Sequence, residues 1–232
     1  MRLLPRLHGK GLAGRRVEGL SFVLFDLDGT LTDPGEGITN SVIYAMKAHG
    51  FEPPPRDELY SVIGPPLSDS FRRLCGVDRE KAAEMILTYR EYYADKGIYE
   101  NALYPGVTGA LARLRDAGRT LAVATSKPEM YALRIIEHFG LSPYFALVGG
   151  CLPDESRVKK AEVIAYVLAG LGAAPESAVM VGDRKYDIEG AAANGVRSIG
   201  VLYGYGSAEE LRQAGASLTA SDPAAVADII LG

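Results

Sequence analysis

The sequence predicts an α/β protein in which a parallel sheet carries helices on both faces, with a small helical module inserted after the first strand. From residue 105 onward, short apolar runs alternate with amphipathic helical stretches, a pattern typical of a parallel sheet covered on both sides. Between residues 34 and 104 the apolar residues recur every three to four positions, and we find no strand-like run there.

Composition narrows the class of protein. The 232 residues have a formal net charge of −4, which argues against a nucleic-acid partner because such proteins usually carry a basic stripe. No apolar run approaches the ~18 residues of a membrane span, so we expect no membrane partner. Cys75 and Cys151 stand far apart without a metal-binding or disulfide pattern. We therefore expect free thiols and a cytoplasmic protein.

Residues 1–19 form a basic N-terminal arm. Leu3-Leu4 is interrupted by Pro5 and no apolar targeting segment follows. We expect a disordered extension, with an upstream start codon as the other explanation for this arm.

The first strand is Phe22–Phe25, four apolar residues followed by carboxylates at Asp26 and Asp28. An extended backbone would point both carboxylates to the same side. Burying two like charges is costly, and a divalent cation would remove the conflict. Asp-Gly is also a strong turn signal, so this stretch alone leaves a turn at Asp28-Gly29 equally open.

The helical module occupies residues 34–104. Its first helix carries Ile38, Val42 and Met46 on one face and is stopped by Gly50. A second helix is expected from Pro66 to Leu74, and a third begins after Asp78 as N-cap and ends before Gly97.

The chain then returns to the core, which we assign to residues 20–33 and 105–232. Further strands are expected at residues 120–125, 145–148, 178–181 and 198–201, and helices at 107–114, 128–139, 159–171, after Ser207 (a capping box with Glu210) and after Asp222-Pro223.

Polar residues follow three of these strands, where open parallel sheets bind their ligands. They are Asp26 and Asp28, Thr125 and Ser126, and Asp183 followed by Asp187, with Lys159 and Lys160 at the start of a nearby helix. Oxygen ligands favour a hard cation such as Mg²⁺. A lysine and hydroxyls beside a cation suit a phosphate group.

Four segments, in order, resemble the four motifs of the haloacid dehalogenase-like (HAD) hydrolases: Asp26-Leu27-Asp28-Gly29-Thr30, Thr125-Ser126, Lys160 and Gly182-Asp183-Arg184-Lys185-Tyr186-Asp187. The resemblance runs from about residue 21 to the C-terminus and is greatest to the phosphoglycolate phosphatase-like branch, which includes some bacterial 5′-nucleotidases. It implies a Rossmann-like core and a Mg²⁺-dependent phosphatase acting on a small phosphorylated metabolite.

The resemblance also implies roles for individual residues. Asp26 would attack phosphorus and form an aspartyl-phosphate, and Asp28 would act as general acid and then base. Thr125 would bind a phosphoryl oxygen, with Ser126 beside it, and Lys160 would neutralise charge. The metal would be held by Asp26, the backbone carbonyl of Asp28 and Asp183, supported indirectly or through water by Asp187.

Under the same resemblance, residues 34–104 would be a cap that closes over the substrate. Lys160 fits the family spacing better than Lys159.

Simpler interpretations exist for each motif. Asp183 and Asp187 suit a helix start, and Thr125-Ser126 suits a cap for the next helix. Gly204-Tyr205-Gly206 weakly resembles a phosphate loop, but a turn into the next helix explains it better. The tyrosines of the module (Tyr89, Tyr92, Tyr93, Tyr99) are better explained by packing than by stacking on a nucleobase.

Three other functions remain as alternatives. A sugar-phosphate mutase on the same scaffold is disfavoured by Gly182-Asp183, because the fourth motif of that branch has a Glu-Asp-like pattern at these positions. A dehalogenase would leave Asp28 and Asp183 unexplained, and a non-catalytic phosphometabolite-binding protein would not need every group. The substrate (phosphoglycolate, a nucleoside 5′-monophosphate or a phosphosugar) and the choice between monomer and dimer stay open.

Overall fold

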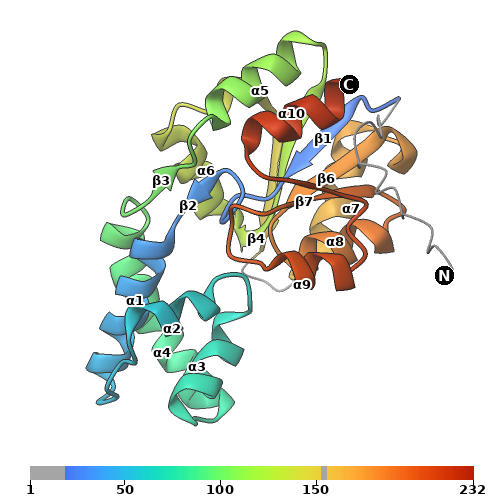
Figure 1. The fold of residues 1–232 in the computed structure, drawn as a ribbon. Coiled ribbons are helices and arrows are strands. Elements are labelled where there is room, and N and C mark those ends of the chain that lie inside the picture. The colour runs from blue at the N-terminus through green and yellow to red at the C-terminus, as the bar shows by residue number, and fades with distance from the viewer. Residues whose placement is uncertain (1–18, 153–155) are drawn as a thin grey trace, which may run out of the picture.

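The computed structural model describes residues 19–152 and 156–232, and its centre is a six-stranded parallel sheet (Figure 1). The strand order is β5-β4-β1-β6-β7-β8, so the first strand lies in the middle. The strands are β1 (Phe22–Phe25), β4 (Thr120–Pro128), β5 (Phe145–Cys151), β6 (Ala178–Gly182), β7 (Arg197–Val201) and β8 (Leu218–Ala220). The predicted α/β fold with a parallel sheet is therefore confirmed.

The sheet has one apolar layer on each face. Side chains alternate along a strand, so Val23 and Phe25 contribute to the layer under one set of helices and Leu24 to the layer under the other. The first set is α5 (Val107–Asp116), α6 (Glu129–His138) and α10 (Pro223–Leu231); the second is α7 (Lys160–Leu171) and α8 (Lys185–Ala193). Two-sided burial explains why the strands read as continuous apolar runs.

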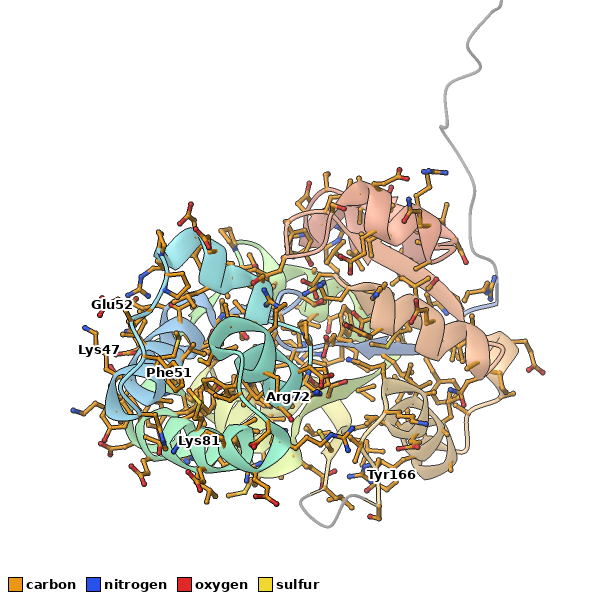
Figure 2. All side chains as sticks on the ribbon, turned by 90° about the horizontal axis from the view of Figure 1, so that it is seen from below. Lys47, Phe51, Glu52, Arg72, Lys81 and Tyr166 are labelled. Carbon is orange, nitrogen blue, oxygen red and sulfur yellow. The ribbon has the colours of Figure 1, made fainter. Side chains whose placement is uncertain are left out.

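The helices between the first strand and residue 104 pack against one another and form a module beside the sheet (Figures 1 and 2). They are α1 (Gly35–Ala48), α2 (Arg56–Leu59), η1 (Tyr60–Val62), α3 (Leu67–Cys75), α4 (Arg79–Tyr92) and the π-helical turn η2 (Tyr93–Gly97). An antiparallel pair, β2 (Thr32–Asp33) and β3 (Ala102–Leu103), joins the chain entering this module to the chain leaving it.

The expectation of no strand within residues 34–104 is therefore wrong at β3. A strand of two residues is too short to show a period-two pattern. The same reason explains why β8, with three residues, was not predicted. The division of the chain into a core and a cap at residues 34 and 104 remains a prediction.

Element ends follow the capping signals closely. The carboxylate of Asp78, the hydroxyl of Ser207 and the carboxylate of Asp222 each accept a hydrogen bond from a first-turn backbone N–H, as N-caps do. The capping box at Ser207 is only half formed, because the Glu210 side chain turns to Arg184 and Lys185.

Three short connecting elements complete the fold: η3 (Ser142–Tyr144), η4 (Pro175–Ser177) and α9 (Ala208–Gln213). Residues 1–18 of the predicted N-terminal extension lie outside the described residues. Within the described ranges, no helix has the length and apolar character that crossing a membrane requires. Cys75 and Cys151 are both free thiols.

Candidate active site

Three aspartates meet at the carboxyl edge of the sheet. Asp26 and Asp183 directly follow the neighbouring strands β1 and β6, and Asp187 lies in the first turn of α8. One carboxylate oxygen each of Asp26, Asp183 and Asp187 can be chosen so that all lie within 4.8 Å of one another. The meeting follows from strand register, because β1 and β6 are adjacent and the Asp26 N–H donates to the Val181 carbonyl. All three residues are buried.

Lys160 lies among these carboxylates. Its Nζ is 2.9 Å from Asp26 Oδ1 and 2.8 Å from Asp187 Oδ1, and it donates to the Ala124 carbonyl at 3.0 Å. The Lys160 side chain is only 5% exposed, whereas Lys159 is exposed at the N-cap of α7. The structure thus brings Lys160 and not Lys159 to the predicted site.

Asp183 has one carboxylate oxygen bound and one free. Oδ2 accepts the backbone N–H of Tyr205 at 2.8 Å, and Oδ1 is buried without a hydrogen-bond partner. No side chain fits beside it: a Cβ on Gly29 would lie 2.5 Å from Asp183 Cγ, and one on Gly204 would lie 2.6 Å from Oδ2. An orphaned, buried carboxylate oxygen beside two further aspartates suits a hard divalent cation.

The charges of this cluster do not balance. Three carboxylates and one ammonium group leave two negative charges among Asp26, Asp183, Asp187 and Lys160. Burial, reinforced by the neighbouring aspartates, raises the pKa of Asp183 well above its usual value. Burial also raises the pKa of Asp187, against the opposing effect of Lys160. Burial alone would lower the pKa of Lys160, but Asp187 and Asp26 outweigh it and raise that pKa. A bound divalent cation would supply the missing positive charge.

Asp28 lies apart from the three aspartates and is paired with a different cation. Lys127 Nζ is 2.7 Å from Asp28 Oδ2, while Asp28 Oδ1 is buried without a partner. Burial raises the pKa of the Asp28 carboxyl, and the Lys127 ammonium partly offsets that rise. The side chain of Asp28 does not join the cluster that could hold a metal.

The two predicted hydroxyl residues lie near the end of β4. Thr125 is 2% exposed, and its Oγ1 accepts the Lys127 N–H at 3.2 Å. The interpretation of Thr125-Ser126 as a helix cap is wrong, since α6 begins after Pro128 and has no side-chain cap. Proline at 128 lacks the N–H that such a cap would bind.

The helix-start interpretation is only partly right: Asp187 lies in the first turn of α8 but is buried, and the N-cap is Arg184 and not Asp183. Asp187 Oδ2 accepts the Arg184 N–H at 3.0 Å, while Oδ1 faces Lys160. Oδ2 is thus hydrogen-bonded, whereas Oδ1 has no hydrogen-bond partner and forms an ion pair with Lys160, which connects Asp187 to Asp26.

Four residues were not predicted to contribute to the site: Lys127, Gly204, Tyr205 and Arg184. Lys127 is in the same strand as Thr125 and could have been found as the only cation beside the second motif. The turn containing Gly204 and Tyr205 does lead into a capped helix, as predicted, but it also binds Asp183. Arg184, within the fourth motif, donates to the Ile63 carbonyl of the helical module.

A family model described as haloacid dehalogenase-like hydrolase matches residues 23–201, well over half of the chain. The chain belongs to the haloacid dehalogenase-like hydrolases. The predicted family and enzyme class are thereby confirmed.

Several known proteins resemble this chain over most of its length. A 5′-nucleotidase of Pseudomonas aeruginosa is 45% identical over 190 residues, covering 82% of this chain and 86% of the relative. The tyrosine-protein kinase PtkA of Mycobacterium tuberculosis is 44% identical, covering 83% of this chain but only 65% of the kinase. A crystal structure of a predicted phosphatase from Clostridium acetobutylicum superposes with a TM-score of 0.87 at 42% identity, covering 91% of this chain and 98% of that one.

Proposed function

We propose that this HAD-like hydrolase is a Mg²⁺-dependent phosphatase that cleaves a small phosphorylated metabolite through an aspartyl-phosphate on Asp26. The observation that supports it most is the position of Lys160 between Asp26 and Asp187, with the free oxygen of Asp183 beside them. Phosphate monoesters hydrolyse so slowly that a nucleophile, fixed positive charge and a general acid must act together.

Asp26 has one oxygen held and one available. The Leu27 N–H at 2.8 Å and Lys160 at 2.9 Å both contact Oδ1, which orients the carboxylate and leaves Oδ2 to attack phosphorus. In the first step the Oδ2–P bond forms and the bond from phosphorus to the leaving oxygen breaks. Water then attacks the phosphoryl group and frees Asp26.

The other polar groups would act on the transferring phosphoryl group and on the leaving oxygen. Lys160 would neutralise phosphoryl charge from its place beside Asp26, and the Thr125 hydroxyl would donate to a phosphoryl oxygen. Asp28 would protonate the leaving oxygen through Oδ1, its unpartnered atom. Afterwards the same oxygen would take a proton from the attacking water.

Mg²⁺ would be held by Asp26 and by the free Oδ1 of Asp183, with the Asp28 backbone carbonyl completing the protein ligands. When bound, the cation neutralises charge on the phosphoryl oxygens and on the aspartates. Its two positive charges match the two uncompensated negative charges of the cluster. Asp187, which binds Lys160 and the Arg184 N–H, would support the site through Lys160.

For the substrate, the resemblance and the relatives favour phosphoglycolate-like compounds or nucleoside 5′-monophosphates. One relative at 45% identity is named 5′-nucleotidase, and another at 32% identity is named phosphoglycolate phosphatase. We further propose that residues 34–104 act as the cap that selects among them, because Tyr93 and Ile63 of this module contact cations at the site.

A sugar-phosphate mutase is a weaker alternative. The mutase branch has a Glu-Asp-like pattern where this chain has Gly182-Asp183. A glutamate at position 182 would place its Cβ against the Asp187 carboxylate. Gly182 thus leaves room for Asp187 to reach Lys160, an arrangement that the mutase pattern would have to change.

The decisive experiment is phosphate release from a panel of phosphorylated metabolites, measured with Mg²⁺ and after chelation. Asp26→Asn should lower turnover of every substrate by at least ~10³-fold, since it removes the nucleophile. Asp116→Asn is the matched control, because Asp116 forms only a surface ion pair with Arg115. Full activity in Asp26→Asn, or activity unaffected by chelation, would reject the proposal.

A further inference from the structure

Lys127 connects the candidate general acid to the helical module. Its Nζ lies 2.7 Å from Asp28 Oδ2 and donates to the Tyr93 hydroxyl, also at 2.7 Å. The Lys127 side chain is 6% exposed. One buried ammonium group therefore contacts both Asp28, in the loop after β1, and Tyr93, a residue of the helical module.

Tyr93 is held firmly by its own surroundings. It begins the π-helical turn η2, is 2% exposed and stacks on Tyr89 with ring centroids 5.4 Å apart and planes 12° from parallel. Tyr131 from α6 makes a T-shaped contact with it, with ring centroids 5.4 Å apart. Because Tyr89 of the module and Tyr131 of α6 both pack on the ring, the hydroxyl is held at the boundary between the module and the helices that cover the sheet.

The contact with Lys127 also determines which oxygen of Asp28 is free. Oδ2 is taken by the ammonium group, and Oδ1 is buried without a partner. If the Lys127 contact were lost, the carboxylate would be free to rotate, and Oδ1 would no longer be held toward the leaving oxygen.

We propose that Lys127 is a positioning residue that, with the Tyr93 hydroxyl docked on it, holds Asp28 in the orientation needed to protonate the leaving group. This inference rests on the proposed phosphatase function and adds to it a link between the module of residues 34–104 and proton transfer. The reaction becomes competent when Tyr93 and Asp28 are both bound to Lys127.

The chemistry of the first step makes this role measurable. As the Asp26 Oδ2–P bond forms and the bond from phosphorus to the leaving oxygen breaks, the proton on Asp28 Oδ1 passes to that oxygen. Asp28 becomes negatively charged, and Lys127 at 2.7 Å stabilises the charge. A p-nitrophenolate leaving group needs no proton, whereas an alkoxide such as that of phosphoglycolate does.

The experiment compares kcat/KM for p-nitrophenyl phosphate and for phosphoglycolate, because kcat/KM reports the first phosphoryl transfer. Lys127→Met should lower kcat/KM for phosphoglycolate roughly 10–100-fold, a part of what general acids contribute, and lower that for p-nitrophenyl phosphate by less than about 3-fold. Tyr93→Phe keeps the ring and should produce the same selective loss, about 3–10-fold.

Two matched controls separate this role from a structural one. Tyr92→Phe removes the neighbouring hydroxyl, which donates to Glu100 within the module, and should leave the ratio between the substrates unchanged. Arg184→Met removes another cation that reaches the module, through the Ile63 carbonyl. It does not contact Asp28, so any loss should be equal for both substrates.

An equal loss on both substrates in Lys127→Met and Tyr93→Phe would overturn the inference while leaving the phosphatase proposal intact. If Lys127→Met does not fold, Tyr93→Phe decides by the same ratio. Failure of the wild-type protein to release phosphate from p-nitrophenyl phosphate and from every phosphorylated metabolite of the panel would instead overturn the proposed function, and the inference with it.

Discussion

Replacing Lys160 with methionine tests the electrostatic basis of the site most directly. The substitution keeps an unbranched side chain of similar length but removes the ammonium group between Asp26 and Asp187. Two buried carboxylates then face each other without compensation. We expect loss of stability in the metal-free protein as well as loss of turnover.

The size of the stability loss follows from burial. Removing one partner of a buried ion pair costs about 3–5 kcal/mol, and a chain of this size loses about 2–4 °C in Tm per kcal/mol. The metal-free variant should therefore melt roughly 6–20 °C below the wild type. Burial raises the pKa of Asp187 to about 6, above its unfolded value of about 4, and the substitution removes the Lys160 ammonium that opposes this rise. The difference should therefore widen as pH rises and narrow toward acid pH.

The assay is thermal unfolding of the two metal-free proteins across pH, with Lys159→Met as the matched control. Lys159 is exposed and adjacent in sequence, so its replacement should change stability by no more than about 0.5 kcal/mol. Mg²⁺ should recover part of the Lys160→Met loss by supplying positive charge. The reasoning is refuted if Lys160→Met and Lys159→Met melt together, or if the difference is independent of pH.

Two further predictions concern the metal site. Gly29→Ala should abolish Mg²⁺-dependent turnover, because Gly29 has φ +81° and a Cβ there would lie 2.5 Å from Asp183 Cγ. The matched control is Gly50→Ala, because Gly50 has φ +79° but lies in open space. This variant should show only the backbone strain of about 1–2 kcal/mol and retain turnover. Equal activity of the two variants would contradict this account. The Tm gain on adding Mg²⁺ should grow from about pH 5 to about pH 7. Burial raises the pKa of Asp183 and raises that of Asp187 to about 6, so the metal-free protein loses stability as these two carboxyl groups ionise. A gain that is constant with pH would show that neither carboxylate is near the cation.

Much of the fold could be predicted because it depends on local signals. Apolar runs identified the longer strands, and Asp78, Ser207 and Asp222 marked helix starts by side-chain chemistry that operates within one turn. The strands that escaped prediction, β2, β3 and β8, are two or three residues long. They exist because a partner strand is next to them, which no local pattern records.

The sequence by itself determined the family, the parallel α/β class and the kinds of residues that gather at one edge of the sheet, because order and spacing along the chain suffice for these. Only the tertiary structure decided which atoms meet. Strand order put β1 beside β6 and so brought Asp26 to Asp183, and the rotation of α7 about its axis buried Lys160 and exposed Lys159. The pairing of Lys127 with Asp28 and Tyr93 joins residues 99 and 34 positions apart. Distances of this kind depend on packing between elements, which sequence periodicity does not encode.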